Sequence, residues 1–400
     1  MHMEKKRQTI STHAALVVSA PGQVRVERVP TPQPQPGEIL VSPFYVGICG
    51  SDLDMLRGTR PVGTRILGHE GVAEVVAVGS GITSFSVGQS VTFLPNNPNN
   101  PEDILGVSTE GLYQQYLLVP QTALERGMVV PCDTGLPLVC GPLSEPFATV
   151  IYGQRLMGHV CKPERMVIMG AGPIGLLNAL YAREQGCSQI FLVDTSQARL
   201  DWAVKRGIVE GSHALLNSPQ LVDMLLERTA GQGVDAAYLC TPRSATRLVL
   251  TQALRLVREE GCIDLTAGTD SRDAFPELPG VDLDGIRQAN VCGLGHEVNQ
   301  YRTREGKKLW LTGQSGASAS YLQEAMQLLL KDPATYAGVI SHLVSYQAAP
   351  RMFEHLLATK PQNIRGMPCV KVLIDFTSEG EEIDVLEPHR VFSSGVQGTD

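Results

Sequence analysis

Side chains of the kinds that bind transition metals stand in three separate segments of the chain. Cys49 lies within Gly-Ile-Cys-Gly-Ser-Asp at residues 47–52, His69 and Glu70 follow 20 residues later, and Glu145 lies between a serine and a proline. A thiolate, an imidazole and one or two carboxylates can form a tetrahedral zinc site that leaves one position open for a substrate. A Zn²⁺ ion in such a site polarises a bound hydroxyl.

The spacing of these residues is weak support when taken alone. A lone cysteine is usually a small buried hydrophobe, and lone histidines and glutamates are usually structural or solvated. Ligands this far apart carry no local signature, so the rest of the chain must decide between the metal site and these ordinary explanations.

A second group of residues has the pattern of a dinucleotide-binding turn. Gly170, Gly172 and Gly175 form a G-x-G-x-x-G that includes Pro173 and Ile174, with an apolar strand-like run before it and a helix-like run after it. The first glycine permits a tight turn, the second lets the backbone approach a pyrophosphate, and the third allows close packing of helix on strand. The helix N-terminus offers free N–H groups to the phosphates.

An acidic residue ends the next expected strand. Asp194 lies 24 residues after Gly170, where a carboxylate accepts hydrogen bonds from the adenosine ribose and repels a 2′-phosphate. Arg199, one helical turn later, suits a 2′-phosphate instead, but the charge clash at Asp194 is the more direct effect. The sequence therefore predicts NAD rather than NADP.

The elements around the glycine turn alternate between strand and helix. Strands are expected at residues 166–169, 189–193 and 234–239, and helices from the glycine turn to about 185 and at 197–205. This alternation is typical of a doubly wound parallel sheet, which we expect to end near His296.

The first 150 residues show a different pattern of expected secondary structure. Short runs of strand-forming residues at 24–26, 39–41, 44–46, 72–78 and 90–93 are separated by Gly and Pro, which favours a barrel-like β domain. Pro-Asn-Asn-Pro-Asn-Asn-Pro at 95–101 predicts a surface loop. An amphipathic helix is expected at 317–330, a strand at 370–374, and a loose polar tail from about Asp375.

Composition sets broad limits on function. The chain has 400 residues, 43% hydrophobic and 18% charged, with a net charge of −8. Its length allows two domains, and its charge argues against a nucleic-acid or anionic-membrane surface. Nine scattered cysteines and no signal-like or membrane-spanning run indicate a cytoplasmic protein.

The ordered motifs together closely resemble those of the zinc-containing medium-chain dehydrogenase/reductase superfamily. They are G-I-C-G-S-D, G-H-E-G-V-A-E-V-V-A-V-G, F-S-V-G-Q-S-V, S-E-P and G-A-G-P-I-G, and the resemblance runs from about residue 14 to 376. The pattern is most similar to the polyol and sugar dehydrogenases. It implies an α/β fold in which a GroES-like β-barrel catalytic domain accompanies a Rossmann domain, with boundaries at 1–149, 150–297 and 298–400, the last segment completing the catalytic domain.

The resemblance also implies roles for single residues. Cys49, His69 and Glu70 fall on the catalytic zinc-ligand motifs, and Glu145 matches a glutamate that binds zinc directly or through water. Ser51 matches the hydroxyl that relays the substrate proton. Asp52 matches the carboxylate that orients the zinc-binding histidine, a support that metal-bound histidines generally need.

The chain departs from the family pattern in two places. Residues 93–115 lack the four cysteines that hold a structural zinc in many members, so we expect one zinc per chain. Asp54 stands where a histidine often ends the proton relay, so either Asp54 takes part or the proton leaves through coenzyme ribose hydroxyls and water.

We therefore expect a zinc-dependent, NAD-linked dehydrogenase of a polyol, sugar or cyclitol, acting as a homodimer or homotetramer. His296, Glu297 and Asn299 are candidates for contacts with substrate hydroxyls, although such a cluster is more often a polar loop. Two alternatives remain: a zinc-free reductase of the same superfamily, which would lack Cys49 and His69, and a non-catalytic NAD-binding protein, which would have lost ligands or Ser51.

Overall fold

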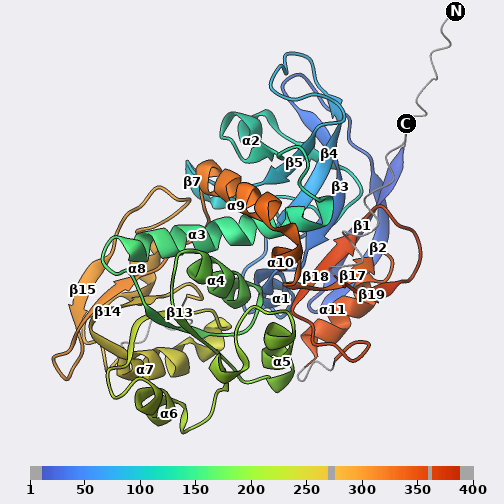
Figure 1. Cartoon of the computed structure of the whole chain (residues 1–400). Helices are drawn as coiled ribbons and strands as arrows, with labels where there is room; N and C mark the ends of the chain where they lie inside the picture. The colour runs from blue at the N-terminus through green and yellow to red at the C-terminus, as the bar shows by residue number, and fades with distance from the viewer. Residues whose placement is uncertain (1–10, 269–274, 359–362, 388–400) are drawn as a thin grey trace, which may run out of the picture.

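The chain forms two β-sheet lobes joined along a long central helix (Figure 1). The computed structural model describes residues 11–268, 275–358 and 363–387. The parallel-sheet lobe comprises residues 165–312. The mixed-sheet lobe comprises residues 11–131 together with residues 340–385 from the end of the chain. The red strands β17, β18 and β19 in Figure 1 thus lie beside the blue N-terminal strands.

The parallel-sheet lobe has seven strands in the order β12-β11-β10-β13-β14-β16-β15. Five neighbouring pairs are parallel, and β15 runs antiparallel at the edge. The bounds are β10 Arg165–Met169, β11 Gln189–Asp194, β12 Ala214–Leu216, β13 Val234–Leu239, β14 Val257–Asp264, β15 Asn299–Arg302 and β16 Lys308–Thr312. From β10 to β12 the chain adds strands toward one side of the sheet, and from β13 to β16 it adds them toward the other side. Doubly wound sheets bind ligands at the point where this strand order changes, which here lies between β10 and β13.

Helices cover both faces of this sheet, so its central strands are apolar on both sides. Four residues of β10 and all of β13 are buried. The helix bounds are α4 Pro173–Glu184, α5 Gln197–Lys205, α6 Leu221–Arg228, α7 Thr246–Leu256 and α8 Leu283–Gln288. Ser196 caps α5 by accepting a hydrogen bond from the backbone of Arg199, which explains why that helix begins where it was expected.

The predicted α/β alternation is confirmed, but the predicted end of the sheet is wrong. We expected the sheet to end near His296, whereas β15 and β16 follow that residue and extend the sheet to Thr312. Isolated short strands such as Lys308–Thr312 carry little periodic signal, so the sequence did not separate them from loop. The domain boundary at 297 stays a prediction.

The large sheet of the mixed-sheet lobe has eight strands. Seven follow the order β19-β17-β18-β3-β4-β5-β9, and β8 also pairs with β3. The bounds are β3 Ile39–Gly47, β4 Glu70–Val78, β5 Ser90–Phe93, β8 Leu117–Val119, β9 Val129–Pro131, β17 Ile340–Ser345, β18 Lys371–Asp375 and β19 Ile383–Val385. Because β18 pairs with β3, the last third of the chain completes the sheet begun by the first third.

Further elements flank this sheet. Strands β1 and β2 form a separate hairpin, and the helices pack at the lobe's surface and against the central helix. Their bounds are β1 Thr12–Ala20, β2 Gln23–Pro30, α1 Gly50–Leu56, α2 Gln121–Glu125, α3 Ser144–Gly158, α9 Ala319–Lys331, α10 Pro333–Ala337 and α11 Ala349–Leu357. The central helix is α3, which contacts both α4 and α9. No helix in the described part of the chain is both long and apolar enough to cross a bilayer.

Two predicted loops contain strands. Within the Asn/Pro segment, β6 Asn96–Asn97 pairs with β7 Asn100–Ile104, and the buried Asn97 side chain bonds Asp103 at 2.7 Å. An asparagine side-chain hydrogen bond therefore stabilises a hairpin in this segment, whose prolines had predicted only a loop. The polar tail begins later than expected, because β19 pairs with β17 and Leu386 is buried. Residues 388–400 lie outside the described residues.

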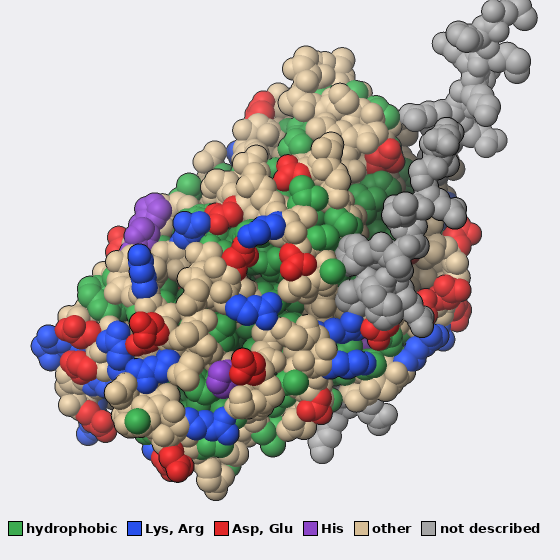
Figure 2. All heavy atoms as spheres, viewed as in Figure 1, with side chains coloured by type: hydrophobic (Ala, Val, Ile, Leu, Met, Phe, Trp, Pro, Cys, Tyr) green, Lys and Arg blue, Asp and Glu red, His purple; other side chains and the backbone are tan. Residues whose placement is uncertain are grey.

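The surface mixes charges of both signs. Figure 2 shows basic and acidic side chains interspersed over the visible face.

All nine cysteines are free thiols.

Candidate metal and coenzyme site

The first metal-ligand candidate lies where a strand becomes a helix. Strand β3 ends at Gly47, and Cys49 is the N-cap residue of α1. The backbone N–H of Cys49 donates to the Asp52 carboxylate at 2.9 Å. This hydrogen bond closes the first turn of the helix and fixes the direction of the Cys49 side chain.

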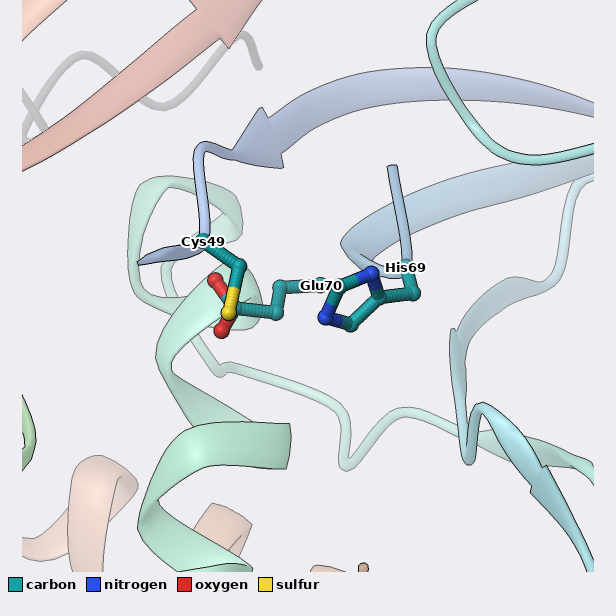
Figure 3. A group of neighbouring side chains, drawn as sticks. All are labelled: Cys49, His69 and Glu70. Carbon is teal, nitrogen blue, oxygen red and sulfur yellow. The ribbon is translucent and has the colours of Figure 1, made fainter. Parts of the chain in front are cut away.

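The second and third candidates open the neighbouring strand. Glu70 is the first residue of β4 and pairs with Gly47 in the β3–β4 register, with His69 just before it. Cys49, His69 and Glu70 each offer one ligand atom, and these atoms lie within 4.8 Å of one another. Figure 3 shows one imidazole nitrogen of His69 turned toward the Cys49 sulfur and the Glu70 carboxylate. The fold therefore brings together the three residues that the sequence had separated.

Asp52 accepts the Cys49 hydrogen bond and also lies beside His69. Its side chain is fully buried, and its Oδ1 lies 3.6 Å from Nδ1 of His69. Its other oxygen accepts a hydrogen bond from the Tyr113 hydroxyl at 2.7 Å. Asp52 thus lies on the side of the imidazole opposite the nitrogen that faces Cys49, as a residue that orients a metal ligand must.

Glu70 has a second partner that the sequence analysis did not identify. Its Oε2 forms an ion pair with the ammonium of Lys371 in β18, and both side chains are buried. Lys371 also donates to the carbonyl of Ile48 at 3.2 Å. Lys371 therefore occupies one oxygen of Glu70.

Glu145 approaches the group from the first turn of α3. It is buried, but it is not one of the residues whose ligand atoms lie within 4.8 Å of one another. Burial raises the pKa of Glu145 to about 7, and the nearby Glu70 charge adds to this effect. The Glu145 carboxyl therefore lies close enough for the Glu70 charge to act on it, but it is not part of the inner group formed by Cys49, His69 and Glu70.

The electrostatics of the group fit a divalent cation. Burial, followed by the charges of Glu70 and Asp52, raises the pKa of the Cys49 thiol well above its usual value. A thiolate there needs added positive charge, because among the described residues Lys371 is the cation that acts on it, and burial and two carboxylates outweigh its effect. Sulfur, imidazole and carboxylate are the ligands that Zn²⁺ prefers, so the residues present fit a zinc ion.

The two relay candidates differ in their placement. The Ser51 hydroxyl lies 3.5 Å from Nε2 of His69, which places it beside the ligand group. Asp54 lies one helical turn further along α1, and its carboxylate is 3.7 Å from the guanidinium of Arg57.

The glycine turn forms the junction between β10 and α4. Gly170 has φ +118°, a conformation that favours glycine. A Cβ on Gly175 would lie 1.8 Å from the carbonyl oxygen of Gly170, whereas one on Gly172 would meet nothing within 4 Å. Pro173 begins α4 and Ile174 follows it. Gly175 is therefore required for packing, and Gly172 leaves space at the helix N-terminus for a ligand.

Asp194 holds this turn in place. Its two carboxylate oxygens accept hydrogen bonds from the backbone N–H groups of Ala171 at 2.7 Å and Ser196 at 2.8 Å. Arg199 instead donates to the carbonyl of Cys369 at 3.1 Å, next to the mixed-sheet lobe. Asp194 thus faces the glycine turn, and one nitrogen of Arg199 is occupied elsewhere.

The proposed substrate contacts at His296, Glu297 and Asn299 are not brought to the metal-ligand group. All three are exposed, and the ring of His296 lies 6.1 Å from that of His159 at the C-terminal end of α3. Glu145 stands at the other end of this helix, about 20 Å away at 1.5 Å per residue. Their exposure fits the alternative of a polar loop, because the sheet continues past this loop and places it at the edge of the sheet.

Two residues of the site were missed by the sequence analysis. Tyr113 carried no local signal, since its contact with Asp52 spans 61 residues. Lys371 did carry a signal: it interrupts the otherwise apolar strand 370–374, and a lysine in a buried strand must be paired.

Comparison with known proteins agrees with this geometry. Residues 35–129 match the alcohol dehydrogenase GroES-like domain, and residues 173–300 match the zinc-binding dehydrogenase domain. Sorbitol dehydrogenase of Ovis aries is 30% identical over 248 residues, which cover 57% of this chain and 68% of that protein. The chain belongs to the zinc-containing medium-chain dehydrogenase/reductase superfamily.

Solved structures of the superfamily share the fold. A zinc-binding dehydrogenase from Sinorhizobium meliloti bound to NADP has a TM-score of 0.68 at 21% identity, covering 92% of this chain and 100% of that one. An alcohol dehydrogenase from Escherichia coli complexed with NADH has a TM-score of 0.67 at 22% identity, with coverage of 92% and 100%.

Membership of the superfamily fixes the general chemistry. This protein is a zinc-type oxidoreductase of the alcohol and polyol dehydrogenase group, and it acts on CH–OH groups of small molecules with a nicotinamide coenzyme.

Proposed function

We propose that this protein is an NAD-linked dehydrogenase that oxidises a secondary alcohol of a polyol, sugar or cyclitol, or catalyses the reverse reduction. The observation that carries the proposal is the group formed by Cys49, His69 and Glu70, whose ligand atoms lie within 4.8 Å of one another. A zinc ion held there would lower the pKa of an alcohol hydroxyl beside it.

Cys49, His69 and Glu70 are the direct ligands in this proposal, and Glu145 acts through water. Support comes from the inner group, which contains Glu70 and not Glu145. Lys371 binds only one oxygen of Glu70. The lysine offsets part of the negative charge that two carboxylates and a thiolate place in one buried site.

Ser51 relays the proton of the substrate hydroxyl: its oxygen takes up that proton as its own proton passes on, and its hydroxyl adjoins the ligand group. Asp52 keeps the His69 ring in place and leaves the opposite nitrogen for the metal. Asp54 is engaged with Arg57, so we propose that the proton leaves through the ribose hydroxyls of the coenzyme and water.

NAD is the proposed coenzyme. Asp194 keeps a negative charge beside the glycine turn, held by two backbone N–H groups. A 2′-phosphate at that position would meet this charge directly. Arg199, the nearest candidate for binding such a phosphate, directs one nitrogen to Cys369.

The polyol class is supported by the similarity to sorbitol dehydrogenase and by Glu145, a further carboxyl that lies near the ligand group. The test is a screen of polyols, sugars and cyclitols with zinc-loaded protein, in which NADH or NADPH formation is followed by absorbance. We expect turnover of at least one polyhydroxylated substrate with NAD. Turnover confined to simple monohydric alcohols, or to NADP, would contradict the proposal.

A further inference from the structure

Arg243 and Arg60, from two separate segments, act on Arg287 beyond the C-terminal ends of β13 and β14. The guanidinium of Arg287 and the side chain of Arg243 both lie next to Gly268: a Cβ placed there would be 2.6 Å from Nη1 of Arg287 and 3.5 Å from Nε of Arg243. Arg287 also experiences the positive charge of Arg60, which belongs to the mixed-sheet lobe. Positive charge from both lobes therefore converges here.

The Arg287 guanidinium is poorly compensated. Its Nη2 donates to the carbonyl of Thr266 at 3.2 Å, while its Nε is buried and has no hydrogen-bond partner among the described residues. Burial lowers the pKa of Arg287 to about 10, and the charge of Arg243 adds to this effect. A guanidinium in these surroundings is stabilised by an anion that accepts two parallel hydrogen bonds.

Two carboxylates from the described residues act on this group. Asp264 and Asp284 are the acids that act on Arg287. Burial raises the pKa of Asp264 to about 6, and its Oδ1 accepts the Thr266 hydroxyl. None of the ion pairs between described residues includes Arg60, Arg243 or Arg287. Among the described residues, three arginines and two carboxylates thus meet around Arg287.

The sheet order places this group on the side of the parallel sheet away from the expected adenosine end of the coenzyme. Asp194 follows β11 and the glycine turn follows β10, whereas Arg243 follows β13 and Gly268 follows β14. A dinucleotide whose ribose is at Asp194 and whose pyrophosphate is at the glycine turn continues toward β13 and β14 with its nicotinamide end. The arginines thus lie beyond the pyrophosphate.

Arg60 links the group to the metal-ligand residues. Its backbone N–H donates to the carbonyl of Asp54 at 3.3 Å, so it folds back against α1. Asp54 is three residues from Ser51, which corresponds to about 4.5 Å along a helix axis. The backbone of Arg60 therefore lies against the helix that carries Ser51.

We propose that Arg60, Arg243 and Arg287 form a subsite for an anionic group on the substrate, a phosphate monoester or a carboxylate carried by the polyol. This inference rests on the proposed function and narrows its substrate class. The hydroxyl to be oxidised lies at the metal, and the anionic end of the same molecule lies between the two lobes. Binding of the anion then draws the lobes together across the cleft.

The test compares matched substrates on the zinc-loaded full chain. Sorbitol is paired with sorbitol 6-phosphate and with gluconate, and kcat/KM is measured for wild type, Arg60→Gln, Arg287→Lys and Arg65→Gln. Arg65 is the control, because it is an exposed arginine that pairs with Glu27 outside the group. We expect wild type to prefer an anionic substrate, and Arg60→Gln to reduce that preference by about 10- to 100-fold. Arg65→Gln should leave it unchanged.

Two further measurements separate the sources of the anion. Binding of inorganic phosphate to the NADH complex is measured by calorimetry, and NADH binding is measured by fluorescence. Weaker phosphate binding in Arg60→Gln with unchanged NADH affinity supports a substrate subsite, even if no polyol in the panel is oxidised. Loss of NADH affinity with unchanged phosphate binding would assign the arginines to the coenzyme and overturn the proposal. Oxidation of neutral polyols with no anion preference in any variant would also overturn it, while leaving the proposed function intact.

Discussion

Asp52 connects several parts of the metal-ligand group through a single carboxylate. One oxygen accepts hydrogen bonds from the backbone of Cys49 and the hydroxyl of Tyr113, and the other lies beside His69. A side chain that holds two ligands at once determines how closely they approach a metal. Its charge also offsets part of the charge of a bound cation.

Replacing Asp52 by asparagine tests this role, since the amide keeps the shape and removes the charge. We expect zinc affinity to fall by about 10- to 100-fold, as for other residues that orient metal-bound histidines. Competition with a chromophoric chelator measures it. Tyr113→Phe is the milder matched change, because it removes one hydrogen bond and leaves the carboxylate. Equal affinity in wild type and Asp52→Asn would show that Asp52 does not position the ligands.

Coenzyme choice also depends on one residue. In Asp194→Asn one oxygen still accepts a backbone hydrogen bond, but the charge that opposes a 2′-phosphate is absent. We expect the ratio of kcat/KM for NAD to that for NADP to fall by roughly tenfold or more, equivalent to about 1.4 kcal/mol. Arg199→Gln is measured alongside it, because Arg199 is the nearest candidate for binding a 2′-phosphate. An unchanged ratio in Asp194→Asn would contradict the role given to that carboxylate.

At this scale the sequence predicted residue types better than their contacts. Cys49, His69 and Glu70 stand in recognisable motifs and are brought together as expected. The pairing of Glu70 with Lys371 spans 301 residues and depends on β18 lying beside β3. No local pattern reports such a pairing, although a lysine within an apolar strand indicates that a partner exists.

At the scale of elements, the turn between β10 and α4 shows how two glycines of one motif differ. Gly175 packs against the carbonyl of Gly170, and Gly172 borders open space. We expect Gly175→Ala to lower the free energy of unfolding by about 1–3 kcal/mol or more, because backbone must move. Gly172→Ala should cost less than about 1 kcal/mol and instead weaken NADH binding.

Urea denaturation and NADH fluorescence titration measure the two effects on the same proteins. The pair serves as its own control, since both substitutions add one methyl group within four residues. Stable, normally binding Gly172→Ala protein would show that no ligand approaches this backbone.

Elements with strong periodicity were predicted close to their observed bounds, as in α5 and β13. Short elements were not, because β6, β7, β15 and β19 are defined by their partners rather than by their own residues. Strand pairing is a tertiary property that a single segment does not encode.

At the scale of the whole molecule, two buried histidines make stability depend on pH. His13 and His342 are almost fully buried, and burial lowers the pKa of each below its usual 6.5. Below that pH the two histidines take up protons more readily in the unfolded chain than in the folded chain. The free energy of unfolding therefore falls as the pH falls. Each histidine contributes up to about 1.4 kcal/mol per pH unit in that window.

Urea denaturation at about pH 7.5 and about pH 5.5 measures this dependence. We expect His342→Gln to be less stable at the higher pH but to lose less stability on acidification than wild type does. His296→Gln, at an exposed position, should follow wild type. An identical loss in His342→Gln and wild type would exclude His342 as a source of the dependence.

The two-lobe organisation itself was predictable, because the chain changes from short strands to strand–helix alternation near residue 150. The return of the last segment to the first sheet was expected only from the resemblance, since no local feature of β17 or β18 points to β3. The arginines that converge from both lobes were not predictable at all without the fold.

The most direct test of the account is removal and return of the metal. Zinc is removed from the full chain by chelation, metal content is measured by mass spectrometry, and polyol oxidation is followed before and after Zn²⁺ is added back. We predict about one zinc per chain, activity that falls in proportion to zinc and returns with it, and no zinc in Cys49→Ser. Undiminished turnover after complete removal of zinc would contradict the account.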